Sequence, residues 1–227
     1  MKFDIITIFP EMFPGYFETS MMKKAQDDGL IDITVHNLRD WSTDKHKTVD
    51  DVAYGGVSGM VMKVEPIYRA IKDLKEKHSN ENIRVILLSA GGEVLKQNKV
   101  RSLSEYDRLI LITGHYKGVD GRVAENIVDE ELSVGEYVVT GGEVPAMIVV
   151  DTVSRMVPGV IGNDESKKGE SYSPGVKREH EVYTRPEIFS PDGKEKWTVP
   201  EILVSGNHKK IKEWREQERE YKNNLDK

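Results

Sequence analysis

Cysteine is absent from this chain of 227 residues. Disulfide bonds, cysteine-ligated metal centres and thiol catalysis are therefore excluded. No apolar run approaches the ~20 residues that a membrane-spanning helix needs. The first residues carry an acid, Asp4, and lack the cleavage pattern of a secretory signal. We therefore expect a cytoplasmic protein that has no membrane partner.

The familiar short motifs of nucleotide binding and hydrolysis are also missing. The chain contains no G-x-G-x-x-G after a strand, no G-x-x-x-x-G-K-[ST], no H-E-x-x-H and no G-x-S-x-G. Its histidines are scattered without metal-ligand spacing, so we predict no metal site. The net charge of −6 means that any contact with nucleic acid must come from local basic patches.

Apolar segments of two kinds alternate along the first two thirds of the chain, and 37% of all residues are hydrophobic. Short apolar runs predict strands, and segments with helical spacing predict helices. This alternation favours an α/β domain with a largely parallel sheet. The predicted strands cover 3–9, 31–38, 85–88, 109–112 and 137–139, and the predicted helices cover 12–28, 65–77, 94–103, 121–128 and 143–156.

Glycines follow three of the predicted strands, at Gly91–Gly92, Gly114 and Gly141–Gly142. Ligands of open α/β sheets bind at the carboxyl ends of the strands, where glycine lets the backbone approach them closely. One interpretation is a shared ligand pocket at this edge. The alternative is that each glycine only permits a tight turn.

Three polar segments break the pattern. Residues 39–63 form a long charged segment that ends in YGGVSGM, which indicates either a substrate-binding loop or a flexible insertion; we favour the loop. Residues 162–185 are typical of a linker. Residues 207–222 predict a highly charged helix, which either is simply solvated or contacts an RNA backbone; its mixed charges favour the first reading.

Eight sequence motifs, in order, are distributed along nearly the whole chain and together resemble the bacterial tRNA (guanine-N1)-methyltransferase family. They are IFPEMF (8–13), DKHKTVDD (44–51), YGGVSGM (54–60), TGHYKGVDGR (113–122), VGEYVVTGGEVPAM (134–147), SRMVPGVIGN (154–163), YTRP (183–186) and SGNHKKIKEWR (205–215). The resemblance implies a homodimeric SPOUT methyltransferase that binds bent S-adenosylmethionine. It also implies methylation of N1 of the guanine immediately 3′ of the tRNA anticodon.

The resemblance further implies the organisation of the chain. Residues 1–161 would form an α/β methyltransferase domain with a largely parallel sheet and a deep C-terminal trefoil knot. Residues 162–185 would be an interdomain linker that orders over the target guanine. Residues 186–227 would form a small, mainly helical C-terminal domain that binds tRNA.

By position in the family motifs, the glycine segments become the cofactor site, where backbone groups read the adenine and apolar walls bury it. The implied cofactor residues are Leu88, Ser89, Ala90, Gly114, Tyr116, Val134, Gly135, Glu136, Tyr137, Val138, Val139, Gly141, Gly142 and Pro145. The expected substrate-binding residues are Asp50, Tyr54, Lys117, Arg185 and His208.

The expected catalytic residues are Glu170 and Arg155. Methylation at N1 requires a base for the N1 proton and a cation for the charge that builds on O6. Arg155 matches the arginine of the SRMVPGV motif, and Glu170 stands where the family carries its catalytic aspartate. Without the resemblance, Glu170 would be read as a solvated linker acid.

Lys117 replaces a family glutamate that is linked to magnesium dependence. A protonated lysine cannot ligate Mg²⁺, so we expect its ammonium to take over part of the metal's electrostatic role. Two alternatives remain for the function. The protein could be a related knotted methyltransferase that acts on another RNA position, or a catalytically impaired paralogue that only binds RNA.

Overall fold

The computed structural model describes residues 1–56, 58–162 and 169–224. Contacts within the chain divide it into two compact units, Met1–Gly162 and Asn163–Lys227. The predicted linker 162–185 includes residues 163–168, which lie outside the described part. The separate linker therefore stays a prediction.

The first unit is built on a sheet of five parallel strands in the order β2-β1-β6-β5-β7. Every residue of the central strand β6 is buried, because helices cover both faces of the sheet. The predicted α/β class with a parallel sheet is confirmed. The strands are β1 (Lys2–Thr7), β2 (Asp32–Asn37), β5 (Ile83–Val94), β6 (Arg108–Thr113) and β7 (Glu130–Ser133).

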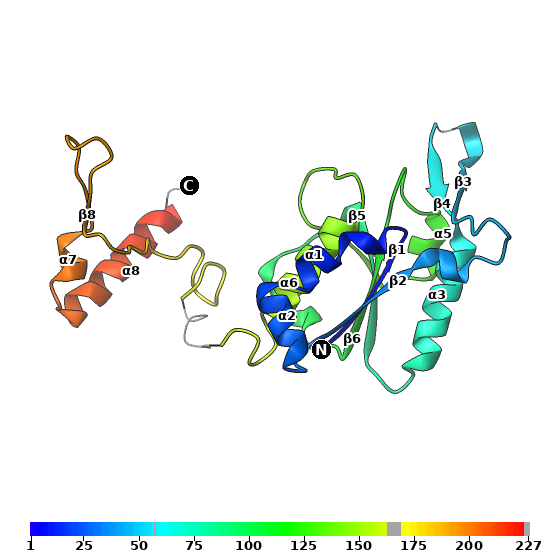
Figure 1. The fold of residues 1–227 in the computed structure, drawn as a ribbon, viewed down its shortest axis with the longest axis horizontal. Helices are drawn as coiled ribbons and strands as arrows, with labels where there is room; N and C mark the ends of the chain where they lie inside the picture. The colour runs from blue at the N-terminus through cyan, green and yellow to red at the C-terminus, as the bar shows by residue number, and fades with distance from the viewer. Residues whose placement is uncertain (57, 163–168, 225–227) are drawn as a thin grey trace. The chain divides into compact units, whose positions relative to one another are not determined.

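Two hydrophobic clusters lie on opposite faces of this sheet. Side chains alternate along β1, so Phe3 and Ile5 enter one cluster while Ile6 enters the other. Figure 1 shows α1, α2 and α6 on one side of the sheet and α3 and α5 on the other. The helices are α1 (Pro14–Phe17), α2 (Ser20–Asp27), α3 (Val64–Lys77), α4 (Gln97–Leu103), α5 (Gly121–Asn126) and α6 (Glu143–Ser154).

The prediction of a buried strand over 137–139 is wrong. The fifth strand is β7, and the side chains of Tyr137, Val138 and Val139 are exposed, 85% of Val138 being open to solvent. An apolar run predicts a buried strand, but the apolar wall of a cavity has the same sequence pattern. The predicted end of the third strand after Leu88 is also wrong, because β5 continues through a register shift to Val94.

Two other segments are more structured than the sequence pattern indicates. The predicted helix 12–28 consists of η1 (Pro10–Met12), α1 and α2, because Thr19 has an extended backbone between the last two. The predicted loop 39–63 contains the end of η2 (Leu38–Trp41), then β3 (Asp50–Val52), η3 (Tyr54–Gly56) and β4 (Met60–Met62). β3 and β4 pair antiparallel as a hairpin.

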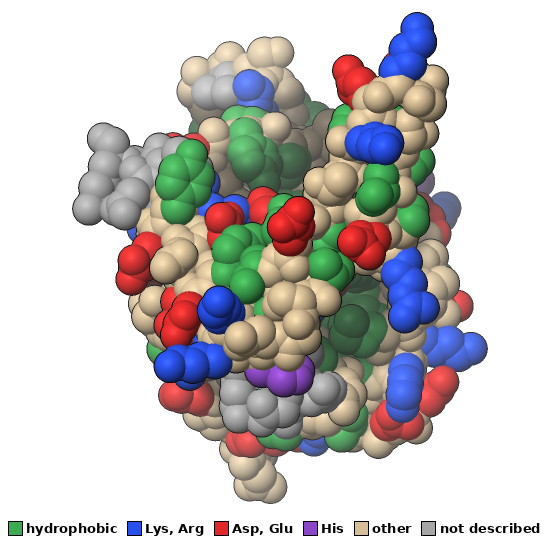
Figure 2. All heavy atoms as spheres, turned by 90° about the vertical axis from the view of Figure 1, so that its left-hand side faces the viewer, with side chains coloured by type: hydrophobic (Ala, Val, Ile, Leu, Met, Phe, Trp, Pro, Cys, Tyr) green, Lys and Arg blue, Asp and Glu red, His purple; other side chains and the backbone are tan. Residues whose placement is uncertain are grey.

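The second unit contains the hairpin β8 (Ile188–Phe189) and β9 (Trp197–Thr198), followed by α7 (Glu201–Val204) and α8 (His208–Asn224). The predicted helix 207–222 is confirmed as α8. Trp214 of this helix lies near the rings of His180 and Tyr183. The face shown in Figure 2 carries Lys and Arg side chains among Asp and Glu side chains.

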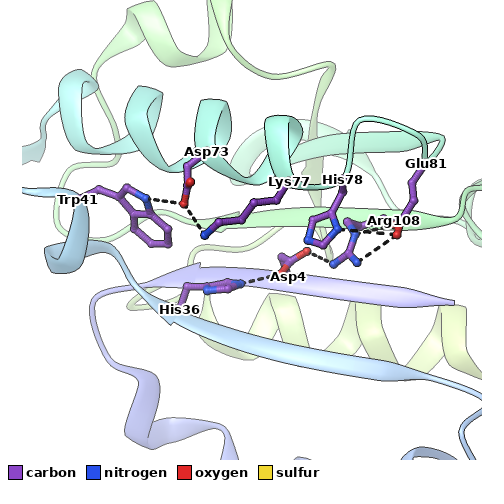
Figure 3. Close-up of polar contacts among 8 residues, drawn as sticks. All are labelled: Asp4, His36, Trp41, Asp73, Lys77, His78, Glu81 and Arg108. Atoms are coloured by element: carbon purple, nitrogen blue, oxygen red, sulfur yellow. Dashed lines mark hydrogen bonds and ion pairs between the residues drawn. The ribbon is translucent and has the colours of Figure 1, made fainter.

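A polar network crosses the sheet between β1, β2 and β6 (Figure 3). The buried carboxylate of Asp4 contacts the guanidinium of Arg108 and lies 2.6 Å from Nε2 of His36. Burial raises the pKa of Asp4, but hydrogen bonds with His36 and Arg108 outweigh it and hold that pKa below its usual value. Removal of the arginine would leave the buried carboxylate with His36 as its remaining partner in this network.

Glu81 completes the network, because it accepts hydrogen bonds from Nε of Arg108 and from Nζ of Lys2, both at 2.8 Å. These two cations, Arg108 first, lower the pKa of Glu81 from 4.5 to about 2. A carboxyl whose pKa is lower in the folded state stabilises the fold above its unfolded pKa. That contribution is lost as the pH falls from 4.5 to about 2.

We predict that Glu81→Gln lowers the free energy of unfolding at pH 6. The difference from the wild type should shrink below pH 4.5 and vanish below pH 2, where the wild-type carboxyl is also protonated. Urea unfolding at a series of pH values measures this. Glu76→Gln is the control, since Glu76 makes only an exposed pair with Lys72. A Glu81 difference that is constant with pH would contradict the prediction.

Candidate active site

One cavity of about 490 Å³ opens beside the middle of β5 and at the carboxyl ends of β6 and β7. Its volume lies within the range of small-molecule sites, roughly 300–1,000 Å³. Three separate segments line it, 87–91, 114–124 and 131–145, and each contributes several residues. The three glycine-containing segments singled out in the sequence therefore do meet around one cavity.

Two of these segments cross at backbone contact distance. The amide of Gly142 donates a 2.8 Å hydrogen bond to the carbonyl of Gly114, and His115 pairs with Gly141 as an antiparallel bridge. A Cβ atom on Gly142 would lie 2.7 Å from Cα of Thr113. Since that neighbour is backbone, it cannot move aside cheaply. Only glycine fits at this position.

Contrary to the sequence prediction, Gly91 and Gly92 do not end the third strand. They lie within β5, where the pairing with β7 shifts between Leu88 and Glu93. A Cβ on Gly92 would meet the backbone of Glu131 at 2.6 Å. Gly92 therefore allows close approach of the two strands through the irregularity, and Ser89, Ala90 and Gly91 face the cavity.

The segment between β7 and α6 forms an apolar wall of the cavity. It begins with a tight turn in which the hydroxyl of Ser133 donates to the carbonyl of Gly135, at 2.7 Å. The ring of Tyr137 then packs on Gly135, where a Cβ would lie 2.2 Å from Cε1. Val138 and Val139 follow and also line the cavity. Because these exposed side chains are apolar, they could contact an apolar or aromatic group bound in the cavity.

The expected cofactor residues line this cavity, with the exception of Gly135 and Glu136, and so does Lys117. Pattern reading missed several lining residues that are sequence neighbours of the expected ones. Their position in the sequence next to the glycines is the signal from which they could be predicted. They are Leu87, His115, Gly118, Val119, Gly121, Ala124, Glu131, Leu132, Ser133 and Thr140, whereas Gly91 belongs to a predicted glycine corner.

The other expected residues of the first unit, Asp50, Tyr54 and Arg155, do not line the cavity. Arg155 is the C-cap of α6 in the first unit, whereas Glu170, Arg185 and His208 belong to the second unit. The expected catalytic pair is thus divided between the units. In the part of the chain that the structure describes, no cluster of His, Asp and Glu could hold a metal ion.

The β3–β4 hairpin carries Asp50 on β3 and Tyr54 beyond it, and the Tyr54 side chain is 98% exposed. Backbone hydrogen bonds join this hairpin to a segment that lines the cavity. The amide of Lys117 donates to Met60 at 3.1 Å, and the amide of Met62 donates to Gly118 at 3.0 Å. The hairpin is therefore anchored beside the cavity.

These features define a class: an α/β protein with a small-molecule site where backbone segments cross at the carboxyl edge of a parallel sheet. Residues 1–227 match the family described as tRNA (Guanine-1)-methyltransferase TrmD. The tRNA (guanine-N(1)-)-methyltransferase of Dictyoglomus turgidum is 51% identical, over 96% of this chain and 84% of that protein. The enzyme of the same name from Thermomicrobium roseum is 50% identical, over 95% of this chain and 77% of that protein.

A solved structure agrees with the sequence relatives. The tRNA (m1G37) methyltransferase from Aquifex aeolicus superposes with a TM-score of 0.76 at 37% identity, covering 94% of this chain and 87% of that one. The chain belongs to the tRNA (Guanine-1)-methyltransferase TrmD family. The expected class, a SPOUT methyltransferase with its knotted α/β fold, is confirmed by this membership, which also implies S-adenosylmethionine as methyl donor.

The cavity fits that donor. Its volume suits a nucleoside-sized ligand, and the exposed apolar side chains of the 134–142 segment offer a wall for an adenine ring. Gly114 and Gly141 bring backbone groups to the lining without intervening side chains. No helix in the described ranges is long and apolar enough to cross a membrane.

We predict that Gly142→Ala abolishes cofactor binding or lowers the free energy of unfolding by at least about 2 kcal/mol. A core substitution that overpacks costs roughly 1–3 kcal/mol, and here the added methyl meets backbone. Gly15→Ala is the control, because a Cβ at Gly15 in α1 meets nothing within 4 Å. Thermal unfolding with and without S-adenosylhomocysteine measures both effects. A Gly142 variant that is as stable and binds as well as the Gly15 variant would contradict the crossing geometry.

Proposed function

We propose that this protein transfers a methyl group from S-adenosylmethionine to N1 of the guanine immediately 3′ of the tRNA anticodon. The observation that supports it most is the convergence of three glycine-containing segments on one cavity, in a chain whose whole length matches the family. The relatives from Dictyoglomus and Aquifex carry names for this reaction.

The bound cofactor supplies an electrophilic methyl group. The 134–142 segment would shield one side of it from water, because the apolar side chains of Tyr137, Val138 and Val139 line the cavity. The chemistry that remains for the protein is to remove the N1 proton and to stabilise the charge on O6. Glu170 is the proposed base and Arg155 the proposed cation.

Assembly as a homodimer is part of this proposal. Arg155 and Glu170 lie in different units of the chain. In a dimer the second unit of one copy can serve the cavity of the other copy, so that each site draws on both. Arg185 and His208 of the second unit, together with Asp50 and Tyr54 of the hairpin, would contact the tRNA in the cytoplasm. An exposed aromatic side chain such as Tyr54 can stack on an unpaired base.

The reaction is tested with purified protein, S-adenosylmethionine and an unmodified tRNA transcript that carries guanine next to the anticodon. We expect a methyl group on N1 of that guanine, mapped by nuclease digestion and mass spectrometry. A transcript with adenine at that position is the control. Methylation of another position would favour a related knotted methyltransferase. Cofactor binding without any transfer would favour an impaired RNA-binding paralogue.

We predict that Glu170→Gln lowers kcat by about 10²–10⁴-fold while the affinity for cofactor is unchanged, because a general base contributes about that much. Glu179→Gln, which removes another acid from the same segment, should keep its activity. Single-turnover methyl transfer measures the rate, and calorimetry measures cofactor affinity. Equal rates for both variants would remove Glu170 from the mechanism.

Lys117 lines the cavity, and its side chain packs against Gly59 of the hairpin. Its charge could therefore influence whether the reaction needs a metal ion. We predict that the wild type keeps most of its activity in excess chelator, since the lysine ammonium supplies positive charge at the site. Lys117→Glu should make activity depend on added Mg²⁺. Complete loss of wild-type activity with chelator, restored by Mg²⁺, would contradict this role.

A further inference from the structure

A buried acid lies directly beneath the cavity. Glu143, in the first turn of α6, is 1% exposed. The hydroxyl of Thr7, at the end of β1, donates a 2.9 Å hydrogen bond to its Oε1. The hydroxyl oxygen of Thr113, at the end of β6, lies 3.2 Å from the same atom. These contacts, with the amino end of α6, offset the lost hydration of a carboxylate.

The second carboxylate oxygen is directed at the lining of the cavity. A Cβ on Gly141 would lie 2.4 Å from Oε2 of Glu143, and Nε2 of His115 lies 4.0 Å from it. Both Gly141 and His115 line the cavity. The carboxylate therefore lies directly against two residues of the cavity lining.

Among the described residues, no hydrogen bond at the other ring nitrogen of His115 turns the imidazole away from Glu143. Its Nδ1 is buried and has no hydrogen-bond partner among the described residues. Its ring packs edge-on against Phe9 and Tyr116, with centroids 4.9 and 5.2 Å away. Nε2 is therefore the ring nitrogen of His115 that faces a charged group, the carboxylate of Glu143.

We propose that Glu143 is a specificity-determining residue that favours the cationic cofactor over its neutral product. This inference rests on the proposed function. When the methyl group leaves, the S–CH₃ bond breaks, sulfur keeps the electron pair, a C–N1 bond forms and the N1 proton passes to the base. The ligand in the cavity thus changes from a sulfonium cation to the neutral S-adenosylhomocysteine.

A fixed negative charge behind the lining attracts the cation and is indifferent to the neutral product. The charge is buried, so solvent and salt screen it weakly. Lys117 and Glu131 also line the cavity but are more exposed, so their fields are screened more strongly. Product release after each turnover is easier when this attraction disappears with the transferred methyl group.

A merely structural role for Glu143 gives a different outcome. If the carboxylate only holds the ends of β1 and β6 against α6, its replacement should weaken binding of cofactor and product alike. If its charge acts on the sulfonium, the ratio of the two affinities must change. That ratio is therefore the quantity to measure.

The experiment compares Kd values for S-adenosylmethionine and S-adenosylhomocysteine by calorimetry in wild type, Glu143→Gln and Thr7→Val. Glutamine keeps the shape and can still accept from Thr7, so the main loss is the charge. We expect the preference for the cation to fall about five- to tenfold in Glu143→Gln, the size of a Coulomb interaction across a thin protein layer. Thr7→Val, which removes a partner but keeps the charge, should leave the ratio unchanged.

Should Glu143→Gln fail to fold, Glu143→Met provides a second test. Methionine also removes the charge and keeps the length of the side chain, so it should lower the preference for the sulfonium to a similar extent. An unchanged ratio in the folded variant overturns the inference, whether or not both affinities fall. Failure of the wild type to bind either compound would instead overturn the proposed function.

Discussion

The crossing of two backbone segments at Gly114–His115 and Gly141–Gly142 is the constraint on which the site depends. A 2.8 Å amide–carbonyl bond and a backbone bridge hold the segments together, and side chains at Gly141 or Gly142 would collide with their neighbours. Because the crossing follows β6 and precedes α6, it ties the central strand to the helix beneath it. The cavity forms where the crossing leaves the carboxyl edge of the sheet open.

Charge is distributed unequally between the two ends of the sheet. At the amino ends of β1 and β6, Asp4, Arg108 and Glu81 form a network in which every charge meets an opposite one. At the carboxyl ends, Glu143 is surrounded by hydroxyls and a histidine. The network around Arg108 stabilises the sheet. The carboxylate of Glu143, in contrast, can attract a cation bound in the cavity.

The sequence predicted most of the sheet because its strands are buried and strongly apolar. β1, β2 and β6 appear close to the expected bounds, and so do the long helices α3, α6 and α8. The glycines marked the edge where the cavity lies. Local pattern could not show that β5 continues past Leu88, because the irregular pairing there depends on a distant strand.

The apolar run 137–139 was misread for a related reason. Its side chains are hydrophobic because they form a cavity wall, and a wall has the same composition as a core strand. The sequence pattern does not indicate a role for Glu143, because its contacts are with residues distant in sequence. These residues are Thr7, Thr113 and His115. The roles of Arg155 and Glu170 came from resemblance to the family, since their residue types and spacing carry no signal of their own.

In the proposed function, the three segments around the crossing form the cofactor site. A crystal structure of the protein with S-adenosylhomocysteine would locate the ligand. We expect density for the compound bounded by residues 87–91, 114–124 and 131–145, with the adenine against Val138 and Val139. Density at any other place, with this cavity holding only solvent, would contradict it.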